Sequence, residues 1–355
     1  SGDLFNTAYR WLGNLRGGLA SATIAACAGF AALSGSSLAS AVTMGRVALP
    51  EMKKYKYEDG LATGSVAAGG TLGFLIPPSA GMIIYAVLTE QSIGRLFMAG
   101  IIPGIILTLL FIGAIYVVVA RKPESGPPGP SFSLKERLLS LRLALPIIAV
   151  VVITIGGMYT GFFTPVEASA VGAFLTFVVA LLRRSLTLAK VKTVILQTLS
   201  ATATVFLIII GAFVFIPFMS LTELPAQLVT LLTSLPIGSI GILIVIILIY
   251  MFLGMFLEGI AMLVLTIPVV IPIAMGMGWD LVWFGIIIVI VLEMGMISPP
   301  VGVNVFVVKS IAPEVPMGTI FRGIWPFWFA MAFMLVLLII FPQIALFLPQ
   351  ALVGG

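Results

Sequence analysis

The sequence predicts an all-α protein of the membrane. Hydrophobic residues make up 61% of the 355 residues and charged residues only 9%, whereas a soluble domain has roughly 25% charged residues. Apolar runs at 101–120, 143–159 and 240–257 each approach the ~20 residues that cross a bilayer as a helix. These runs do not alternate apolar and polar residues, as the strands of a membrane barrel do. The chain is therefore expected to cross the bilayer several times as helices.

The scarce reactive residues exclude several kinds of chemistry. The chain has no histidine and one cysteine, Cys27, which lies in an apolar stretch. No internal disulfide, His-based metal site or His general base is therefore available. Three acids, Glu167, Glu258 and Glu293, lie within or beside apolar segments but are too scattered for a catalytic pair. We expect a protein that is not an enzyme, and one whose net charge of +5 reflects basic cytoplasmic loops.

The first part of the chain predicts one surface helix followed by elements of unusual length. Residues 3–15 have the spacing of an amphipathic helix at the membrane interface. Residues 19–33 and 38–49 are each too short for a span, so they predict a re-entrant hairpin with its tip at 34–37. Residues 61–90 predict a discontinuous helix, because two prolines at 77–78 end a helix. A span is expected at 97–120, followed by a hydrophilic linker.

The remaining segments predict a similar series of elements after two plain spans. Those spans are expected at 143–161 and 165–182. The elements that follow are a span at 196–218, an interfacial helix at 222–235, a second hairpin at 238–275, a second discontinuous helix at 281–309 and a last span within 318–348.

The two ends of the chain resemble each other, which indicates an internal repeat. GFLIPPSAGMIIYAV begins at Gly73 and GMISPPVGVNVFVV at Gly295. The same offset in residue number separates Pro77 from Pro299 and also Pro50 from Pro272. The predicted organisation is a first repeat at 1–120, a cytoplasmic linker at 121–142, scaffold spans at 143–195 and a second repeat at 196–355. The chain begins at Ser1 rather than Met, and we expect that further N-terminal helices are missing from it.

The basic residues predict that the repeats are inverted. With residues 46–56 in the cytoplasm, counting the crossings also puts the loops at 121–142, 183–192 and 309–322 there. All but one of the 18 Lys and Arg residues then lie on that side, and Arg95 is the exception, in accordance with the positive-inside rule. The first hairpin then enters from the cytoplasm and the second from outside. Inverted repeats are a common plan of secondary transporters, with the binding site at the midplane.

The two tips and the two helix breaks are expected to form an ion and substrate site. Unwound backbone exposes carbonyl oxygens that suit Na⁺, and helix N-termini suit a carboxylate. The metal candidates are Ser34, Gly35, Ser36, Ser37, Gly70, Thr71, Gly73, Pro77, Gly259, Thr266, Gly295, Met296 and Pro299. The substrate candidates are Ser37, Ser79, Ser298 and Asn304.

These candidate residues also have plainer interpretations. Small residues pack membrane helices together, and Asn304 and Thr266 could form hydrogen bonds between helices. Glu258 at the second tip could bind a cation or a proton, and Glu293 precedes the second break. Glu167 follows a Thr-Pro helix start, where it is expected to cap the helix.

The segments SGSSLASAVTMGRVALPEMKK, LATGSVAAGGTLGFLIPPSAGMIIYAV, GMYTGFFTPVEASAVGAF, FLGMFLEGIAMLVLTIPVVIPIA and MGMISPPVGVNVFVV resemble the large membrane subunit of TRAP (tripartite ATP-independent periplasmic) transporters. The resemblance covers nearly the whole chain. It implies an inverted-repeat, elevator-type fold and Na⁺ as coupling ion. It also implies import of an organic acid, such as a C4-dicarboxylate or sialic acid, across the bacterial inner membrane. The implied partners are a small TRAP membrane subunit and a periplasmic substrate-binding protein. The family often has Asp at the second tip, where this chain has Glu258.

Two other functions compete with this interpretation. A Na⁺/carboxylate elevator symporter that needs no binding protein would have a similar plan. A channel would need a continuous polar pore, against which two dead-end hairpins argue. The sequence names neither the carboxylate nor the Na⁺ stoichiometry.

Overall fold

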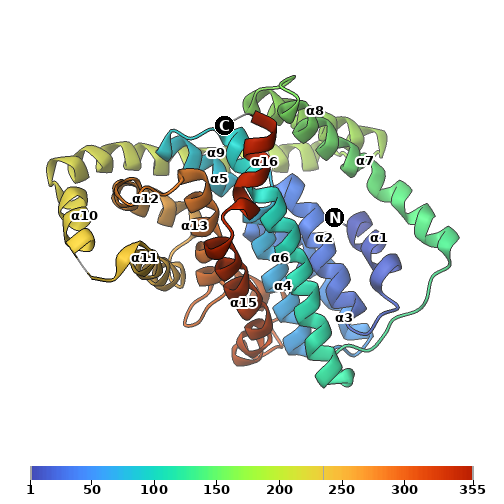
Figure 1. The fold of residues 1–355 in the computed structure, drawn as a ribbon. Helices are drawn as coiled ribbons and strands as arrows, with labels where there is room; N and C mark the ends of the chain where they lie inside the picture. Colours follow the sequence, from blue (N-terminus) through green and yellow to red (C-terminus); the bar gives the residue numbers. More distant parts are fainter. Residues whose placement is uncertain (1, 235, 354–355) are drawn as a thin grey trace.

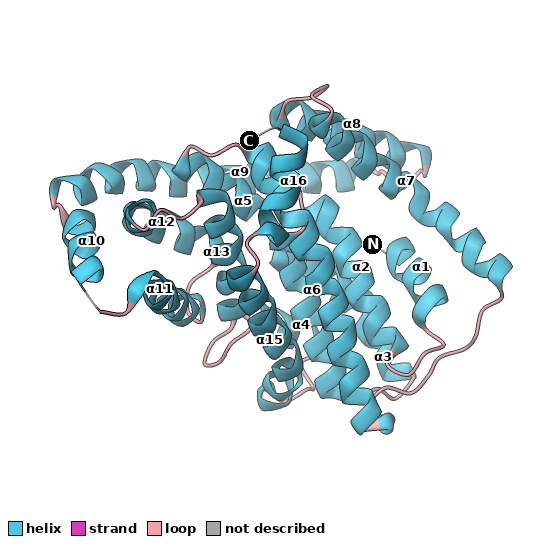
Figure 2. Ribbon diagram, in the orientation of Figure 1, coloured by secondary structure: helices cyan, strands magenta, loops and turns pink. Residues whose placement is uncertain are grey.

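The computed structural model describes residues 2–234 and 236–353. In these residues helices are the sole regular secondary structure (Figure 2). The chain order is α1 (Gly2–Leu12), α2 (Gly18–Ser34), α3 (Ser37–Lys54), α4 (Asp59–Leu75), α5 (Ala80–Thr89), α6 (Ile93–Arg121), a short 3-10 helix (Pro123–Ser125), α7 (Leu134–Tyr159), α8 (Pro165–Leu182), α9 (Leu188–Leu221), α10 (Leu224–Ser234), α11 (Gly238–Gly254), α12 (Gly259–Gly276), α13 (Leu281–Met296), α14 (Val303–Ile311), α15 (Met317–Ile340) and α16 (Gln343–Val353).

The predicted class, an all-α membrane protein, is confirmed. Seven helical segments of the described chain are long and apolar enough to cross a membrane: Asp59–Thr89, which joins α4 and α5, and α6, α7, α8, α9, α12 and α15. Three apolar helices, α2, α11 and α13, are shorter. The predicted interfacial segment 222–235 contains α10, but its last residue lies outside the described residues, as do residues 1, 354 and 355 of the predicted repeats.

Prolines and capping side chains set the ends of several helices. The two prolines at 77–78 have no backbone donor, and α5 begins only after Ser79, whose side chain accepts from Met82 N at 3.2 Å. Thr164 and Glu167 form a capping box at the start of α8, so the predicted capping role of Glu167 is confirmed. Glu258 Oε2 accepts from Ile260 N and thereby caps α12.

The helix bounds repeat along the chain with the same offset of 222 residues that separates Pro77 from Pro299. Helices α1 and α3, moved by 222 residues, have the bounds of α10 and α12. Helices α2, α4 and α5, moved in the same way, match α11, α13 and α14 to within two residues. Each half also packs on the other: α3 of the first half contacts α14 of the second, and α12 of the second half contacts α5 of the first. The boundary predicted at residue 195 falls inside α9, where the helix continues without interruption.

Helices α4 and α13 run in opposite directions along α6. Glu58, at the start of α4, donates its backbone N–H to Ser125, just past the end of α6. A Cβ atom on Gly100, nearer the start of α6, would lie 2.7 Å from Leu75 O at the end of α4. In contrast, α13 begins beside the start of α6, where a Cβ on Gly285 would lie 3.1 Å from Leu96. The ends of α4 and α13 lie close together, because a Cβ atom on Gly259 would contact both Phe74 and Met296.

Figure 1 shows a dense centre and a more open periphery. The central helices, among them α2, α4, α6, α13 and α15, bury most of the core, and nearly every residue of α13 is buried. The helices α7, α8 and α9 lie along one side of this centre and expose most of their apolar side chains. In a bilayer such a surface faces lipid or another membrane chain.

Candidate functional site

Each hairpin is held to its neighbouring helix break by a backbone hydrogen bond. Four short segments form these junctions: the first tip (34–37), the first break (76–79), the second tip (255–258) and the second break (297–302). Ala80 N, just after the first break, donates to Gly35 O at 3.1 Å. Gly302 N, at the end of the second break, donates to Met255 O at 3.1 Å. The two donors are separated by the repeat offset, and the two acceptors by nearly the same number of residues. Each half of the chain therefore forms a similar junction.

Glycines allow the backbone to approach closely at both junctions. A Cβ atom on Gly73 would lie 2.5 Å from Ser36 O, and one on Gly70 would lie 3.1 Å from Ser37 O. In the second half, a Cβ on Gly295 would lie 2.7 Å from the Cα atom of Gly254. Larger residues at these positions would push the tips away from the breaks. The structure thus brings the first tip against the candidates Gly70 and Gly73.

Several hydroxyl groups near the first tip already have local partners. Ser34 Oγ and Ser40 Oγ lie 2.8 Å apart, and Ser36 Oγ accepts from Ala39 N at 3.4 Å as the cap of α3. Thr71 Oγ1 donates to Ala68 O at 2.6 Å within α4. Pro77 lies in the first break. A cation at this junction would therefore use backbone carbonyl oxygens as well as hydroxyl groups.

The second set of candidates surrounds Gly259, which follows the second tip. A Cβ atom on Gly259 would lie 2.9 Å from Leu292 Cδ2, 3.3 Å from Phe74 Cζ and 3.5 Å from Met296 Sδ. Gly295 and Pro299 lie at the end of α13 and in the second break. Because Phe74 belongs to α4, the first half of the chain contributes directly to the junction in the second half.

Thr266 lies away from this junction. It is about two helical turns from the second tip, roughly 12 Å at 1.5 Å per residue. Its Oγ1 donates to Met262 O at 2.8 Å and lies 2.5 Å from the hydroxyl oxygen of Tyr250. Thr266 therefore forms a hydrogen bond between α12 and α11. This is the plainer interpretation given to Thr266 from the sequence.

Among the substrate candidates, the two serines of the breaks are buried and bonded. Ser79 Oγ donates to Phe74 O at 2.5 Å, and Ser298 Oγ donates to Met294 O at 2.6 Å. Trp328 Nε1, from α15, also donates to Ser298 Oγ at 3.0 Å. These bonds fix the backbone around each break. Asn304 lies in the first turn of α14 and is fully buried, and Ser37 is buried at the first tip.

Glu293 is a buried acid beside the first tip and the second break. It lies in the last turn of α13, and the side chains of Ser37 and Asn304 face it. Glu258, whose carboxylate caps α12, is the nearby charged group. The site thus joins the first tip to the second break as well as each tip to its own break.

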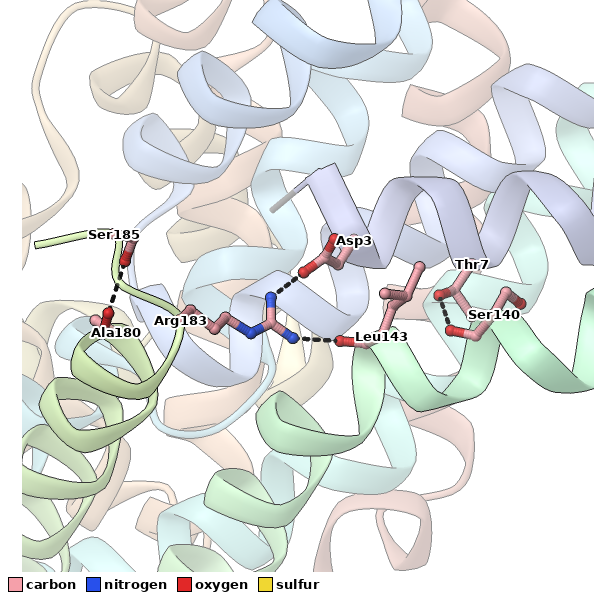
Figure 3. A network of polar contacts seen from close by, with 7 residues as sticks. All are labelled: Asp3, Thr7, Ser140, Leu143, Ala180, Arg183 and Ser185. Atoms are coloured by element: carbon pink, nitrogen blue, oxygen red, sulfur yellow. Dashed lines mark hydrogen bonds and ion pairs between the residues drawn. The ribbon is translucent and has the colours of Figure 1, made fainter.

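A separate polar network ties α1 to the peripheral helices (Figure 3). Arg183, after α8, pairs with Asp3 of α1 and donates to Leu143 O of α7 at 2.9 Å. Thr7 Oγ1 donates to Ser140 O of α7 at 2.9 Å. The predicted interfacial helix is thereby attached to α7 and α8.

Sequence reasoning missed two contributors to the junction and the surroundings of a third. Phe74 and Trp328 are aromatic residues in apolar stretches, and no pattern in the sequence distinguishes them. Glu293 was identified as an acid within an apolar segment, before the second break, but its approach to Ser37 was not predicted because the two residues are far apart in sequence. A usable signal was present: the repeat offset places Glu293 opposite Thr71, a position already chosen as a candidate.

Comparison with known proteins gives one consistent answer. Residues 1–344 match the family described as tripartite ATP-independent periplasmic transporter, DctM component. The chain is 37% identical to the C4-dicarboxylate TRAP transporter large permease protein of Pseudomonas aeruginosa, over 98% of this chain and 81% of that protein. It is 34% identical to the sialic acid TRAP transporter large permease protein of Vibrio cholerae, over 99% of this chain and 82% of that protein. It is 36% identical to the ectoine/5-hydroxyectoine TRAP transporter large permease protein of Ruegeria pomeroyi, over 98% of this chain and 81% of that protein.

Proposed function

Because this chain belongs to the DctM family of tripartite ATP-independent periplasmic transporters, we propose that it imports an organic acid by Na⁺ symport. In this proposal it is the large permease subunit in a bacterial inner membrane. It works with a small TRAP membrane subunit, and a periplasmic binding protein delivers the substrate. The observation that carries the proposal is the pair of junctions in which a hairpin tip is bonded to a helix break.

The junctions have the chemistry that Na⁺ coupling needs. Unwound backbone at the two breaks exposes carbonyl oxygens, which are hard ligands suited to Na⁺. Helices α3, α5, α12 and α14 all begin at a tip or a break, and their N-terminal N–H groups suit a substrate carboxylate. Substrate and cation can therefore bind side by side with few charged side chains.

We propose that α2–α3 and α11–α12 are re-entrant hairpins and that they move with the broken helices as an elevator. Each tip is bonded to its break, and residues such as Ser37 are buried there rather than exposed at the end of a full span. The opposite directions of α4 and α13 along α6 support an inverted arrangement, with one hairpin entering from each side. The peripheral helices α7, α8 and α9 would form the fixed frame.

The substrate class rests on the relatives. Proteins 31–37% identical to this chain are named for C4-dicarboxylate, sialic acid and ectoine transport. We propose a carboxylate substrate of this kind, with the choice among carboxylates made largely by the binding protein.

Uptake by proteoliposomes tests the proposal. The chain would be reconstituted with its small subunit and the matching binding protein, with succinate, N-acetylneuraminate and ectoine as radiolabelled probes. We expect accumulation of one probe that requires an inward Na⁺ gradient and ceases when K⁺ replaces Na⁺. Equal uptake without Na⁺ would overturn the symport proposal. Equal uptake without the binding protein would favour a symporter that works alone.

A further inference from the structure

The junction contains two buried polar side chains without partners. Glu293 is 1% exposed and Asn304 is 0% exposed. Within the described part of the chain, neither carboxylate oxygen of Glu293 and neither Oδ1 nor Nδ2 of Asn304 has a hydrogen-bond partner. Buried polar groups are almost always hydrogen-bonded, because a buried group without a partner loses its hydration with nothing in return. Ser37 and Asn304 face the Glu293 carboxylate, yet none of these carboxylate and amide atoms is placed in hydrogen-bond geometry, so the three side chains can instead converge on a bound ion.

The surroundings of Glu293 offer no positive charge. None of the four ion pairs in residues 2–234 and 236–353 includes Glu293. The polar side chains that face it are those of Ser37 and Asn304, and the charged group that acts on it is another acid, Glu258. A charged carboxylate buried beside a second acid is unfavourable, so it must either bind a cation or take up a proton.

The repeat shows that this charge is specific to the second half. The repeat offset places Glu293 opposite Thr71, whose hydroxyl group already donates to Ala68 O. It places Asn304 opposite Met82, which is apolar. The two junctions are alike in backbone, yet among the described residues only the second supplies an unpartnered carboxylate and amide.

We infer that Glu293, Asn304 and Ser37 form a binding site for one monovalent cation, which the proposed Na⁺ symport identifies as Na⁺. The inference rests on that proposed function and adds a residue-level site to it. A carboxylate, an amide oxygen and a hydroxyl oxygen are hard ligands of the kind Na⁺ takes, and one Na⁺ balances the single charge of Glu293. Asn304 Nδ2 can at the same time donate to the second carboxylate oxygen.

A divalent ion fits the site less well. Calcium sites use several carboxylates, and magnesium is usually bound by one or two carboxylates together with waters or phosphates. Among the described residues, no group of three or more His, Cys, Asp or Glu side chains could hold a metal ion. Glu258 is also engaged, because its carboxylate accepts from two backbone N–H groups of α12.

Thermal unfolding of the purified chain in detergent tests the site without any substrate. The midpoint would be measured over a range of NaCl concentrations, with KCl replacing NaCl to keep ionic strength constant. Ions that bind the folded protein raise the midpoint as their concentration increases, and near saturation the slope against the logarithm of the concentration is proportional to the number of ions bound. We expect Glu293→Gln to lose one ion from this dependence, and Asn304→Ser to raise the half-saturating Na⁺ concentration by about tenfold, equivalent to one lost ligand.

Two further variants keep the result interpretable. Glu314→Gln removes an exposed carboxylate between α14 and α15 and is expected to leave the Na⁺ dependence unchanged. Glu293→Asp keeps the charge and is expected to retain the ion with weaker affinity. If Glu293→Gln retains the full Na⁺ dependence, Glu293 holds no cation and the inference is wrong. The inference is also wrong if the wild-type midpoint does not change when KCl replaces NaCl, because the protein then has no preference for Na⁺.

Uptake measurements separate this inference from the proposed function. If wild-type proteoliposomes need no Na⁺ gradient, the symport proposal fails, whatever the unfolding data show. If the wild type needs Na⁺ and the reversal potential of Glu293→Gln gives the same number of Na⁺ ions per substrate, only the inference fails. One ion fewer in the variant supports both.

Discussion

Single glycines decide how closely the central helices approach each other. On α4 and α15, a Cβ atom on Gly323 would collide with Gly60 O, and one on Gly64 would collide with Gly323 O. This contact has no side chain between the two backbones, as at small-residue crossings of membrane helices. The sequence shows these glycines, but it does not reveal which of the 37 glycines lie at such a crossing.

Gly323→Ala is expected to destabilise the protein by about 1–3 kcal/mol or more, because the added methyl group must separate α15 from α4. Gly318→Ala, earlier on α15, is the matched control: a Cβ there meets no atom within 4 Å. It should be neutral or stabilise the helix by up to about 1 kcal/mol. Thermal unfolding in detergent measures both. Equal midpoints for the two variants would contradict the close crossing.

An exposed ion pair between the end of α3 and the loop before α15 gives a pH prediction. Lys53 Nζ lies 2.7 Å from Glu314 Oε1. The hydrogen bond from Lys53 lowers the pKa of Glu314 below its ordinary value of 4.5, and the bond to Glu314 raises the pKa of Lys53 above 10.5. The stabilisation is therefore complete between these ordinary values. It is lost as the pH falls through the lowered pKa of Glu314, or rises through the raised pKa of Lys53.

Glu314→Gln should therefore lower the unfolding midpoint slightly and by a constant amount between about pH 5 and pH 10. The difference from the wild type should shrink in strong acid and in high salt, which screens exposed pairs. Unfolding midpoints across the pH range, compared with Lys53→Gln, measure it. A difference that grows towards acid pH would show that the pair does not account for it.

At the scale of elements, the helix breaks were predictable and their partners were not. The prolines at 77–78 and 299–300 predict both interruptions, because proline cannot continue a helix, and the structure has α4, α5, α13 and α14 ending or starting there. The approach of the first tip to Glu293 depends on how two distant segments pack. No local pattern encodes that packing, so Glu293 was predicted only as an intramembrane acid and its position beside the first tip was not.

The bond between the first tip and the first break predicts a sharp functional effect at Gly35. Its φ is +59°, and a Cβ would lie 2.7 Å from Pro78 O. Gly35→Ala is expected to shift the tip and to lower Na⁺-driven uptake on the order of tenfold or more, because small displacements of binding groups are costly. Gly29→Ala in α2 is the control, since its Cβ would meet only Leu4 at the ordinary distance of 3.6 Å.

The reconstituted uptake described above measures both glycine variants. Normal expression and folding of Gly35→Ala would be checked by gel filtration. Uptake by Gly35→Ala equal to that of Gly29→Ala would show that the geometry of the first tip is not needed for transport.

At the scale of the whole molecule, the proposed elevator motion requires the second hairpin to move past the periphery. Met219 of α9 and Ile267 of α12 line one cavity of about 400 Å³. In contrast, Thr7 of α1 and Ser140 of α7 are joined by a hydrogen bond within the network of Figure 3. In the proposed motion, Met219 and Ile267 lie on opposite sides of the boundary between the fixed and the moving helices. Thr7 and Ser140 both lie in the fixed part.

Cysteine cross-linking distinguishes the two pairs. In a Cys27→Ala background, a short bismaleimide linking Met219→Cys to Ile267→Cys should abolish uptake, because α12 could no longer slide past α9. The same reagent on Thr7→Cys and Ser140→Cys should leave most uptake intact. Full activity of the cross-linked first pair, verified by mass spectrometry, would rule out motion across this boundary.

The exchange of contacts between the two halves has a consequence for synthesis of the protein. Helix α3 packs on α14 and α12 packs on α5, so the first half lacks these partners until the second half is made. Helix α3 begins at residue 37 and α14 only at residue 303. At about 5–20 residues per second, that gap lasts roughly thirteen to fifty seconds. Throughout that delay the polar turn between α2 and α3 lacks the helices α13 and α14 that lie against it in the folded protein.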